Sequence, residues 1–311
     1  MSKLDLFTPI DVDKELFEFG EECGWVKTSP NEAFMQQLAT TMKLENPNRP
    51  SKPGFVRPSS LTDCIRNLVF EYLGDPEESA YDGTPRIGES GTDANRRIQD
   101  YISIMKNHGY DVEYMDIKEY LHQFPNPDLE VIDESKGIEI LTSDIPTDSI
   151  TYIVEGKMKT KKLSWFLDRY HGTETLVYNK RTHARFKADG IVKFKGEYYV
   201  LEIKTENNTK YGKHAKTLEP HYKHTLQGGY YAMDFGIDKV MFLYENRDNC
   251  RFFVTVMDVT EELKRKVNYL VTETIRYGEN NWIAPRTVSK DECMFCPYKT
   301  RCDAIGESVS R

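Results

Sequence analysis

The chain has 311 residues, of which 39% are hydrophobic and 12% aromatic, and its formal net charge is −8. This composition excludes extensive disorder, allows one large domain or two smaller ones, and argues against a general nucleic-acid coat protein. The sequence contains no run of the roughly 18–20 apolar residues that would span a bilayer. It also lacks an apolar signal-peptide segment at its start. We therefore expect a soluble, intracellular protein without a membrane partner.

The N-terminal third is predicted to be mainly helical. Residues 1–47 are acidic with helical periodicity, and a proline-containing extended linker follows them. Ser60 or Thr62 is expected to cap a helix that ends at Leu73. The apolar side of this helix consists of Leu61, Ile65, Leu68 and Tyr72. A glycine-rich turn, DGTPRIGESG, is predicted to precede a second helix over residues 92–107.

Residues 110–172 have the least regular pattern in the chain. Short strands are expected at 138–142 and 150–155, and no long periodic segment stands out. We therefore predict an insertion or lobe for this part of the chain.

The hydrophobic period changes to two residues near Glu174, which predicts strands. Three strands are expected in succession, TETLVYN, ARFKADGIVKF and EYYVLEIKT, with a hairpin turn at Lys195-Gly196-Glu197 between the last two. A helix over residues 221–235, two further strands and a final helix that starts at Thr260 follow. This order predicts an α/β fold with a mixed central β-sheet flanked by helices.

Two acidic residues and a lysine form the most distinctive motif of the strand region. Asp189 ends one strand segment, and Glu202 follows it across the hairpin, so both carboxylates are expected at one end of the sheet. Oxygen ligands of this kind suit Mg²⁺ or Mn²⁺, and the carbonyl of Ile203 is a further candidate ligand. Lys204 shares a strand face with Glu202 and is expected to position a water molecule for attack on a phosphodiester. The alternative is an exposed edge strand in which Glu202 pairs with Lys204.

The helix after this motif carries two further candidates for catalytic residues. Gln227 and Tyr231 share one helix face with His224. The paired glycines Gly228 and Gly229 disfavour a helix by about 1.5–2 kcal/mol, which indicates a close backbone approach. Either a bound strand or the sheet beneath the helix would explain that approach.

A basic stretch surrounds the motif. Residues 180–223 carry 11 lysines and arginines against five acids, a local charge of +6 within an acidic chain. Aromatic residues are interleaved with these cations, as in sites for single-stranded nucleic acids. The alternative is a solvated charged loop. The candidate substrate-binding residues are Arg185, Lys210, Lys213, Lys216 and His224.

The C-terminal tail contains a C-x2-C-x5-C motif. Its thiols belong to Cys293, Cys296 and Cys302. Cys64 is the candidate for a fourth ligand, and a four-cysteine set serves zinc or an iron–sulfur cluster equally well by ligand chemistry. The alternative is a redox or free-thiol pair. The isolated Cys23 and Cys250 are predicted to be buried thiols.

Together, these motifs resemble the RecB-like branch of the PD-(D/E)xK nuclease superfamily. The most similar members carry iron–sulfur clusters: the CRISPR-adaptation exonucleases, the AddB subunit nuclease and the nuclease domain of replication helicase-nucleases. The resemblance covers residues 57–302 and includes RPSSLTDCIRNLVFEYLG with Cys64 and Arg66, the FKADGIVKF and YYVLEIKT strands, the Q-x3-Y element and the cysteine tail. It implies a restriction-endonuclease-like core in which a 4Fe–4S cluster joins the N- and C-terminal parts.

The activity implied by this resemblance is metal-dependent hydrolysis of DNA. We expect an exonuclease on single-stranded DNA or strand ends, in recombination or repair, with a phage or mobile element as one source. The resemblance places it in the bacterial or infected-host cytoplasm, beside a helicase or recombination partner. One position departs from the family: Asn95 stands where its G-x3-H motif has a metal-binding histidine. Asn95 offers Mg²⁺ or Mn²⁺ a neutral oxygen. The alternative is therefore a catalytically weak or inactive DNA-binding or assembly protein that keeps the nuclease fold.

The chain is accordingly divided into five predicted segments. These are an N-terminal helical and linker segment (1–56), a helical part with the first cluster cysteine (57–109), an insertion or lobe (110–172), the nuclease core (173–277) and a cluster-binding tail (278–311).

Overall fold

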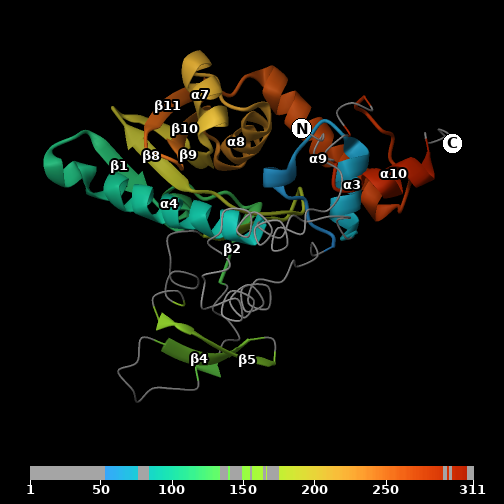
Figure 1. Cartoon of the computed structure of the whole chain (residues 1–311), viewed down its shortest axis with the longest axis horizontal. Coiled ribbons are helices and arrows are strands. Elements are labelled where there is room, and N and C mark those ends of the chain that lie inside the picture. The colour runs from blue at the N-terminus through green and yellow to red at the C-terminus, as the bar shows by residue number, and fades with distance from the viewer. Residues whose placement is uncertain are drawn as a thin grey trace, which may run out of the picture.

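The computed structural model covers most of the chain from residue 53 onward (Figure 1). The described residues are 53–75, 84–133, 139–140, 149–154, 156–163, 166, 175–289, 293 and 296–306. The helix expected within residues 1–47 lies outside them, as does Cys23.

Helices and strands alternate along the chain. The helices are η1 (Pro58–Ser60), α3 (Ile65–Leu73), α4 (Thr84–Ile104), η2 (Met105–His108), α5 (Ile117–Gln123), α7 (Asn208–Thr217), α8 (Tyr222–Phe235), α9 (Glu261–Glu279) and α10 (Lys299–Ile305), where η marks a 3-10 helix. The strands are β1 (Val112–Met115), β2 (Leu129–Ile132), β3 (Glu139–Ile140), β4 (Ser149–Val154), β5 (Lys157–Lys162), β6 (Leu176–Asn179), β7 (Ala184–Lys187), β8 (Gly190–Phe194), β9 (Glu197–Glu206), β10 (Lys239–Asn246) and β11 (Phe252–Asp258).

Five strands form the central sheet, in the order β1-β8-β9-β10-β11. Strands β9 and β10 are parallel, and the other neighbouring pairs are antiparallel. Strand β1 lies within residues 110–172, so that segment contributes an edge strand to this sheet. The mixed sheet with flanking helices confirms the predicted fold class, whereas the five-segment division of the chain stays a prediction.

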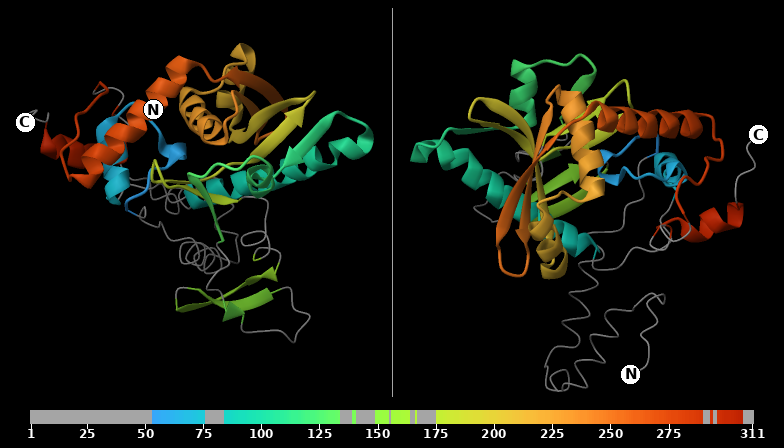
Figure 2. Two further views of the ribbon diagram at one scale, coloured as in Figure 1. Left: turned by 180° about the vertical axis from the view of Figure 1, so that it is seen from behind. Right: turned by 90° about the horizontal axis from the view of Figure 1, so that it is seen from above.

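Helices cover both faces of the central sheet (Figure 2). On one face, Ile98 of α4 packs with Leu201 and Ile203 of β9. On the other face, helices α3, α8 and α9 share a larger core with the sheet, which includes Val200 of β9 and Leu226 of α8. Strand β9 contributes side chains to both cores because successive side chains of a strand point to opposite faces of the sheet.

The segment ARFKADGIVKF forms two strands, not the single strand expected. Strand β7 joins a small sheet of order β2-β6-β7, and β8 joins the central sheet, with the break at Ala188 and Asp189. Gly190 follows at a φ of 135°, a conformation that side chains rarely allow. A Cβ on Gly190 would also come within 2.5 Å of the Tyr114 ring. The chain therefore turns sharply at Asp189, which leaves this side chain at the end of the central sheet.

The predicted hairpin between β8 and β9 is confirmed. Phe194 pairs with Glu197, and the two residues between them, Lys195 and Gly196, have φ angles of 52° and 83°. Positive φ at both central positions is the geometry of a tight two-residue hairpin turn. The predicted helix over 221–235, the two strands after it and the Thr260 cap of the last helix are also confirmed, as α8, β10, β11 and α9.

Two helices extend beyond the sequence prediction. Helix α4 already begins at Thr84, where a glycine-rich turn was expected. Pro85 lies in its first turn, where a helix has no need of the missing N–H. Helix α7 occupies the segment expected to be a loop, and the side chain of Asn207 caps it by accepting a hydrogen bond from the main-chain N–H of Lys210 (3.0 Å). The Asn207 cap thus marks the start of a helix that the sequence analysis did not predict.

The predicted cap of helix α3 is wrong. Neither Ser60 nor Thr62 caps it; Cys64 is the N-cap residue and makes no side-chain cap bond. The hydroxyl of Thr287, from the C-terminal part of the chain, accepts the hydrogen bond from the main-chain N–H of Ile65 at 3.0 Å. The predicted apolar stripe of α3 is buried as expected. A tertiary contact therefore replaces the local cap.

A separate three-stranded sheet is formed by β3, β4 and β5, and Figure 1 shows it set apart from the central sheet. Strands β3 and β4 correspond to the short strands expected at 138–142 and 150–155. None of the helices in the described part of the chain has the length and apolar character needed to cross a membrane.

The paired glycines of α8 are explained by packing. A Cβ on Gly228 would lie 2.9 Å from Val240 and 3.0 Å from Phe242, and a Cβ on Gly229 would lie 2.9 Å from Leu263. Gly228 therefore lets α8 approach the central sheet, and Gly229 lets it approach α9. Close packing, rather than a bound strand, accounts for both residues.

We expect Gly228→Ala to destabilise the protein. The added methyl overpacks the contact with the sheet, at a cost of about 1–3 kcal/mol, which outweighs the gain of about 1 kcal/mol in helix propensity. Gly212→Ala in α7 is the matched control, because a Cβ there meets nothing within 4 Å. The control should be more stable than the wild type in urea unfolding. Equal behaviour of the two variants would contradict this explanation.

Candidate active site and cysteine cluster

The carboxylate of Asp189 lies against strand β9. Its Oδ2 accepts a hydrogen bond of 2.6 Å from the main-chain N–H of Ile203, the residue between Glu202 and Lys204. Asp189 is 9% exposed and Glu202 is 1% exposed, so two carboxyl groups are buried at the same end of the sheet. In a strand, the N–H and C=O of one residue point the same way, so the Ile203 carbonyl is also on the Asp189 side of β9. The hairpin thus brings together the motif residues that the sequence singled out.

Lys204 and Glu202 form an ion pair. Lys204 Nζ lies 2.5 Å from Glu202 Oε2, and 20% of the lysine side chain is exposed. The pair does not belong to an edge strand, because β9 lies between β8 and β10. A buried carboxylate is costly unless a positive charge or hydrogen bonds compensate for it. The ammonium group supplies such a charge.

Three residues from other elements hold Asp189 in place. Asn95 Nδ2 of α4 donates to Asp189 Oδ1 at 2.9 Å. The main-chain carbonyl of Asp189 accepts hydrogen bonds from Gln99 Nε2 (2.6 Å) and from the Tyr114 hydroxyl (2.9 Å). Sequence reasoning found Asn95 and missed Gln99 and Tyr114. Gln99 lies one helical turn after Asn95, so its position on the same face of α4 was a signal that could have identified it.

Tyr231 and Gln227 lie on α8, which covers one face of the central sheet. The Tyr231 hydroxyl donates to the Lys187 carbonyl at 3.1 Å and accepts from Gln227 Nε2 at 3.1 Å. Burial, together with the charge of Glu202, raises the pKa of Tyr231 well above its ordinary value. The phenol therefore stays protonated, and its bond to the carbonyl of β7 supports the backbone that leads into Asp189.

His224 has a different environment from that of a phosphate-binding cation. Its Nδ1 lies 2.8 Å from the Tyr244 hydroxyl. Burial lowers the pKa of His224 to about 3, and the nearby charge of Lys204 acts in the same direction. His224 is therefore neutral near pH 7, and any contact with DNA would be a hydrogen bond rather than an ion pair.

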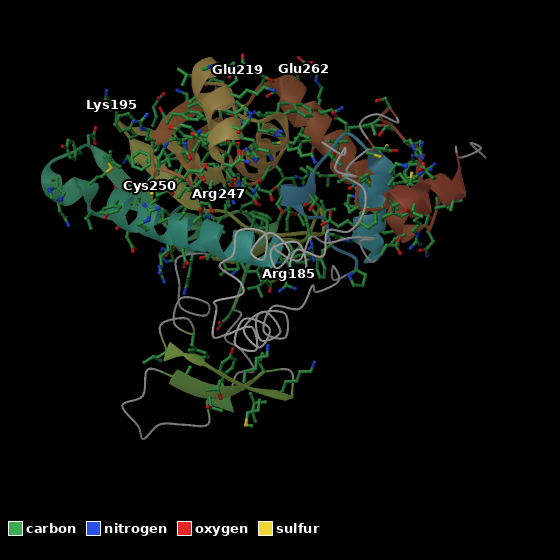
Figure 3. The ribbon with its side chains drawn as sticks, viewed as in Figure 1. Arg185, Lys195, Glu219, Arg247, Cys250 and Glu262 are labelled. Carbon is green, nitrogen blue, oxygen red and sulfur yellow. The ribbon has the colours of Figure 1, made fainter. Side chains whose placement is uncertain are left out.

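The other predicted substrate-binding residues lie on two surfaces. Lys210, Lys213 and Lys216 are exposed on helix α7, which follows strand β9. Arg185 lies on β7 in the small β2-β6-β7 sheet, with its guanidinium 5.7 Å from the centre of the Phe55 ring. Figure 3 labels Arg185 on the other side of α4 from Arg247.

The four cysteines of the predicted cluster line one cavity, at the junction of α3 with the C-terminal part of the chain. Cys64, Cys293 and Cys302 are buried, and Cys296 is half-buried. Burial raises the pKa of the Cys64 thiol and of the Cys293 thiol. The fold therefore gathers residues that are more than 200 positions apart in the sequence around one space.

Nitrogen donors point at two of these sulfur atoms. Cys302 Sγ accepts from Arg66 Nη1 at 3.4 Å and from Arg286 Nη2 at 3.3 Å, and Cys296 Sγ accepts from Asn67 Nδ2 at 3.2 Å. Arg66 is 1% exposed, and it also binds the carbonyls of Ala284 and Gly306 at 2.7 Å each. Side-chain N–H donors thus hold the sulfur atoms of Cys296 and Cys302 in place at the cavity.

Cys250 is exposed, so its prediction as a buried thiol is wrong. It lies in the turn between β10 and β11 with a φ of 55°. Strand β11, which begins two residues later, has side chains that alternate between exposed and half-buried.

Among the described residues, no three His, Cys, Asp or Glu side chains converge as ligands of a single metal ion. The site at Asp189 contains two carboxylates and otherwise amide and carbonyl groups. The four cysteines surround a cavity and do not meet at one point.

Comparison with known proteins gives structural neighbours only. No family model and no curated protein matches the sequence. The crystal structure of SSO0001 is 15% identical, with 88% of this chain and 97% of that chain covered and a TM-score of 0.43. An alkaline exonuclease from Laribacter hongkongensis, LHK-Exo, in complex with dAMP is 15% identical, with coverages of 73% and 89% and a TM-score of 0.41. At these values the likeness is one of general architecture.

We expect Tyr231→Phe to lower the free energy of unfolding by about 1–3 kcal/mol, because it leaves the buried Lys187 carbonyl and Gln227 amide without their partner. Tyr222→Phe on the same helix is the matched control, since its hydroxyl binds Asp63 at the surface. The control should change stability by no more than about 0.5 kcal/mol. Similar losses in urea unfolding of both variants would show that the Tyr231 hydroxyl has no special structural role.

Proposed function

We propose that the chain is a divalent-metal-dependent nuclease that hydrolyses DNA phosphodiesters. The observation that carries this proposal is the hydrogen bond from the Ile203 N–H to the Asp189 carboxylate, which brings Asp189 beside Glu202 and Lys204. Two buried carboxylates and an amine at a sheet end are the groups that metal-assisted hydrolysis of a phosphodiester requires.

The oxygen atoms of this site fit a hard cation. Asp189 and Glu202 offer carboxylates, and the Ile203 carbonyl lies on the Asp189 side of the strand. Asn95 donates through Nδ2 to Asp189, so its amide oxygen remains as an acceptor. Such an all-oxygen set suits Mg²⁺ or Mn²⁺. When bound, the ion would act as a Lewis acid that stabilises the negative charge developing on the phosphate.

The residues of the chain supply the remaining functions. Lys204 is the group that would hold the attacking water, because its ammonium is paired with Glu202 and part of its side chain is exposed. Gln227 and Tyr231 would support the site from behind through their bonds to each other and to β7. The exposed lysines of α7 and Arg185 would contact the phosphates of the substrate, for which single-stranded DNA or strand ends are the proposed form.

This proposal includes exonuclease action in recombination or repair, with a helicase or recombination protein as partner. A chain of this kind would act in the cytoplasm, in a bacterium or an infected host. These finer assignments follow from the sequence resemblance to RecB-like nucleases described above.

The nuclease assignment is tested with end-labelled single-stranded and duplex DNA in Mg²⁺ or Mn²⁺. We expect the wild type to cleave, and Asp189→Asn and Lys204→Ala each to lower the rate by about 100-fold or more, since each removes stabilisation of the transition state. Lys118→Ala, an exposed lysine on α5, is the matched control and should cleave like the wild type. Thermal melts verify folding, because Lys204→Ala leaves Glu202 without its cation. Unimpaired cleavage by Asp189→Asn would refute the assignment.

Asn95 is expected to set the metal preference. Its neutral oxygen is a harder ligand than imidazole, so the wild type should work relatively better in Mg²⁺, and Asn95→His should shift the ratio of cleavage rates toward Mn²⁺. Rates in both ions for the two proteins measure this ratio. An unchanged ratio would mean that residue 95 does not touch the ion.

We also propose that Cys64, Cys293, Cys296 and Cys302 hold a 4Fe–4S cluster. The thiols line a cavity rather than meeting at a point, and among the described residues Arg66 Nη2 and Arg286 Nε are buried without a hydrogen-bond partner. Spare donors of this kind fit the sulfur atoms and negative charge of such a cluster better than a single zinc ion. The cluster would join α3 to the C-terminal tail.

The cluster assignment is tested on protein purified without oxygen. We expect a brown protein with iron and acid-labile sulfide in equal amounts, whose colour fades with dithionite. We expect Cys302→Ser to lose both the colour and thermal stability, because the cluster would cross-link distant parts of the chain. If the protein is colourless and contains zinc, the four cysteines bind structural zinc and not an iron–sulfur cluster.

A second candidate function is a DNA-binding or assembly protein with weak or no catalysis. The observation that favours it is that the polar groups of the site already have partners within the protein. Both oxygens of Asp189 accept hydrogen bonds, and Lys204 is paired with Glu202. Binding of DNA without cleavage in either metal would support this function over the nuclease.

A further inference from the structure

A hollow lined by arginines lies next to the candidate active site. Its walls include Arg96 and Arg97 of α4, Thr205 of β9, and Arg247 and Cys250 of the turn between β10 and β11. In Figure 3, Arg247 and Cys250 are labelled beside one another at helix α4. Two segments that are far apart in the sequence, α4 and the turn between β10 and β11, therefore place arginines around one space.

The hollow adjoins the residues of the proposed metal site. Thr205 directly follows Lys204 on β9, and Arg96 directly follows Asn95 on α4. The side chain of Ile203 packs toward α4, and Thr205, two residues on, shares its strand face. The hollow therefore opens on the α4 face at the end of β9, whereas the side chains of Glu202 and Lys204 lie on the opposite face of the strand.

One wall of the hollow is held rigidly. Arg97 Nη2 donates to both carboxylate oxygens of Glu245, at 2.7 and 2.9 Å, and Glu245 is 2% exposed. The hydrogen bond to Glu245 raises the pKa of Arg97, so this guanidinium keeps its charge. A charged pair fixed in this way presents a prearranged surface to a ligand.

The other charged side chains at the hollow favour the binding of an anion. Arg96 Nη2 lies 3.9 Å from Asp93, a distance typical of a weak surface pair. Arg247 is exposed, and among the residues that the structure describes it has no ion-pair partner. The hollow is thus lined by three arginines and two carboxylates, those of Asp93 and Glu245. A phosphodiester carries the negative charge that would pair with the exposed guanidinium of Arg247.

We propose that this hollow binds one phosphate group of the DNA substrate, with Arg247 as the main contact. The proposal rests on the proposed function and identifies the substrate contact beside it. The guanidinium group matches phosphate oxygens in geometry and charge. No aromatic residue lines the hollow, so it lacks the stacking surface that would suit a base.

Arg247→Gln is the informative variant, because Arg247 makes no side-chain ion pair in the described chain whose loss would disturb the fold. DNA affinity is measured by fluorescence anisotropy with EDTA present, so that the strand is not cleaved. We expect Arg247→Gln to bind about 10-fold more weakly and to lower the slope of log affinity against log salt by about one, as the loss of one phosphate contact predicts. Arg251→Gln changes the same charge in the same turn, outside the hollow, and should bind within about twofold of the wild type.

The position of the phosphate is resolved with three oligonucleotides that differ only at their ends. They carry a 5′-phosphate, a 3′-phosphate or hydroxyls at both ends. If Arg247→Gln weakens binding only of a phosphorylated end, the hollow takes a terminal phosphate. If all three are weakened equally, it takes an internal one. Equal affinities of Arg247→Gln and the wild type for all three would overturn the proposal.

Cys250 offers an independent readout that requires no substitution. Its exposed thiol lines the hollow, so bound DNA should slow its alkylation by iodoacetamide by about threefold or more at saturation. Mass spectrometry of the peptide that contains Cys250 measures the rate, and chloride at equal ionic strength is the control. An unchanged rate with DNA bound would place the strand elsewhere.

The two proposals fail in different ways. If the nuclease assignment is wrong, the protein binds DNA without metal-dependent cleavage, and Arg247→Gln still lowers the DNA affinity. If the proposal on the hollow is wrong, the wild type cleaves DNA, but Arg247→Gln and Arg251→Gln bind DNA with the same affinity.

Discussion

The hydrogen bond between the Asp189 carboxylate and the main-chain N–H of Ile203 is the constraint on which the site depends. It requires that the chain leave the small sheet after β7, turn at Gly190 and enter the central sheet as β8. The turn has room for no side chain at position 190, because the Tyr114 ring occupies that space. Because of this main-chain bend, the Asp189 carboxylate contacts the main chain of β9 at Ile203 instead of continuing a strand.

A second constraint ties the two ends of the described chain together. Thr287 caps helix α3 from the C-terminal part, and Arg66, deep inside the protein, binds carbonyls at Ala284 and Gly306. A buried guanidinium is costly unless its donors are satisfied, so these carbonyls and the sulfur of Cys302 act together. The same contacts bring the four cysteines to one cavity, which makes the C-terminal tail part of the fold rather than an appendage.

The two faces of the sheet at the end of β9 differ in how their charged side chains are paired. On the α8 side, Lys204 balances Glu202, and burial keeps His224 neutral. On the α4 side, Arg97 balances Glu245, and the charge of Arg247 remains available at the surface. A polyanion that crosses the end of the sheet would thus meet a closed charge pair on one side and an arginine open to solvent on the other. This asymmetry is a property of the tertiary arrangement, since the residues concerned come from α4, α8, β9, β10 and the turn after β10.

The sequence by itself determined the class of fold, the hairpin at Lys195 and Gly196, and the grouping of Asp189, Glu202 and Lys204, because period-two burial and turn preferences act between near neighbours in the chain. Only the tertiary structure decided the break at Asp189, the cap supplied by Thr287, the role of Gly228 in packing, and the exposure of Cys250. Asn95 meets Asp189 across 94 positions of sequence, and the Asp189 carbonyl is bound by Gln99, one turn further along α4, and by Tyr114 of β1. Helical spacing places Asn95 and Gln99 on one face of α4, but their contacts with Asp189 exist only when the sheet and its covering helices have packed together.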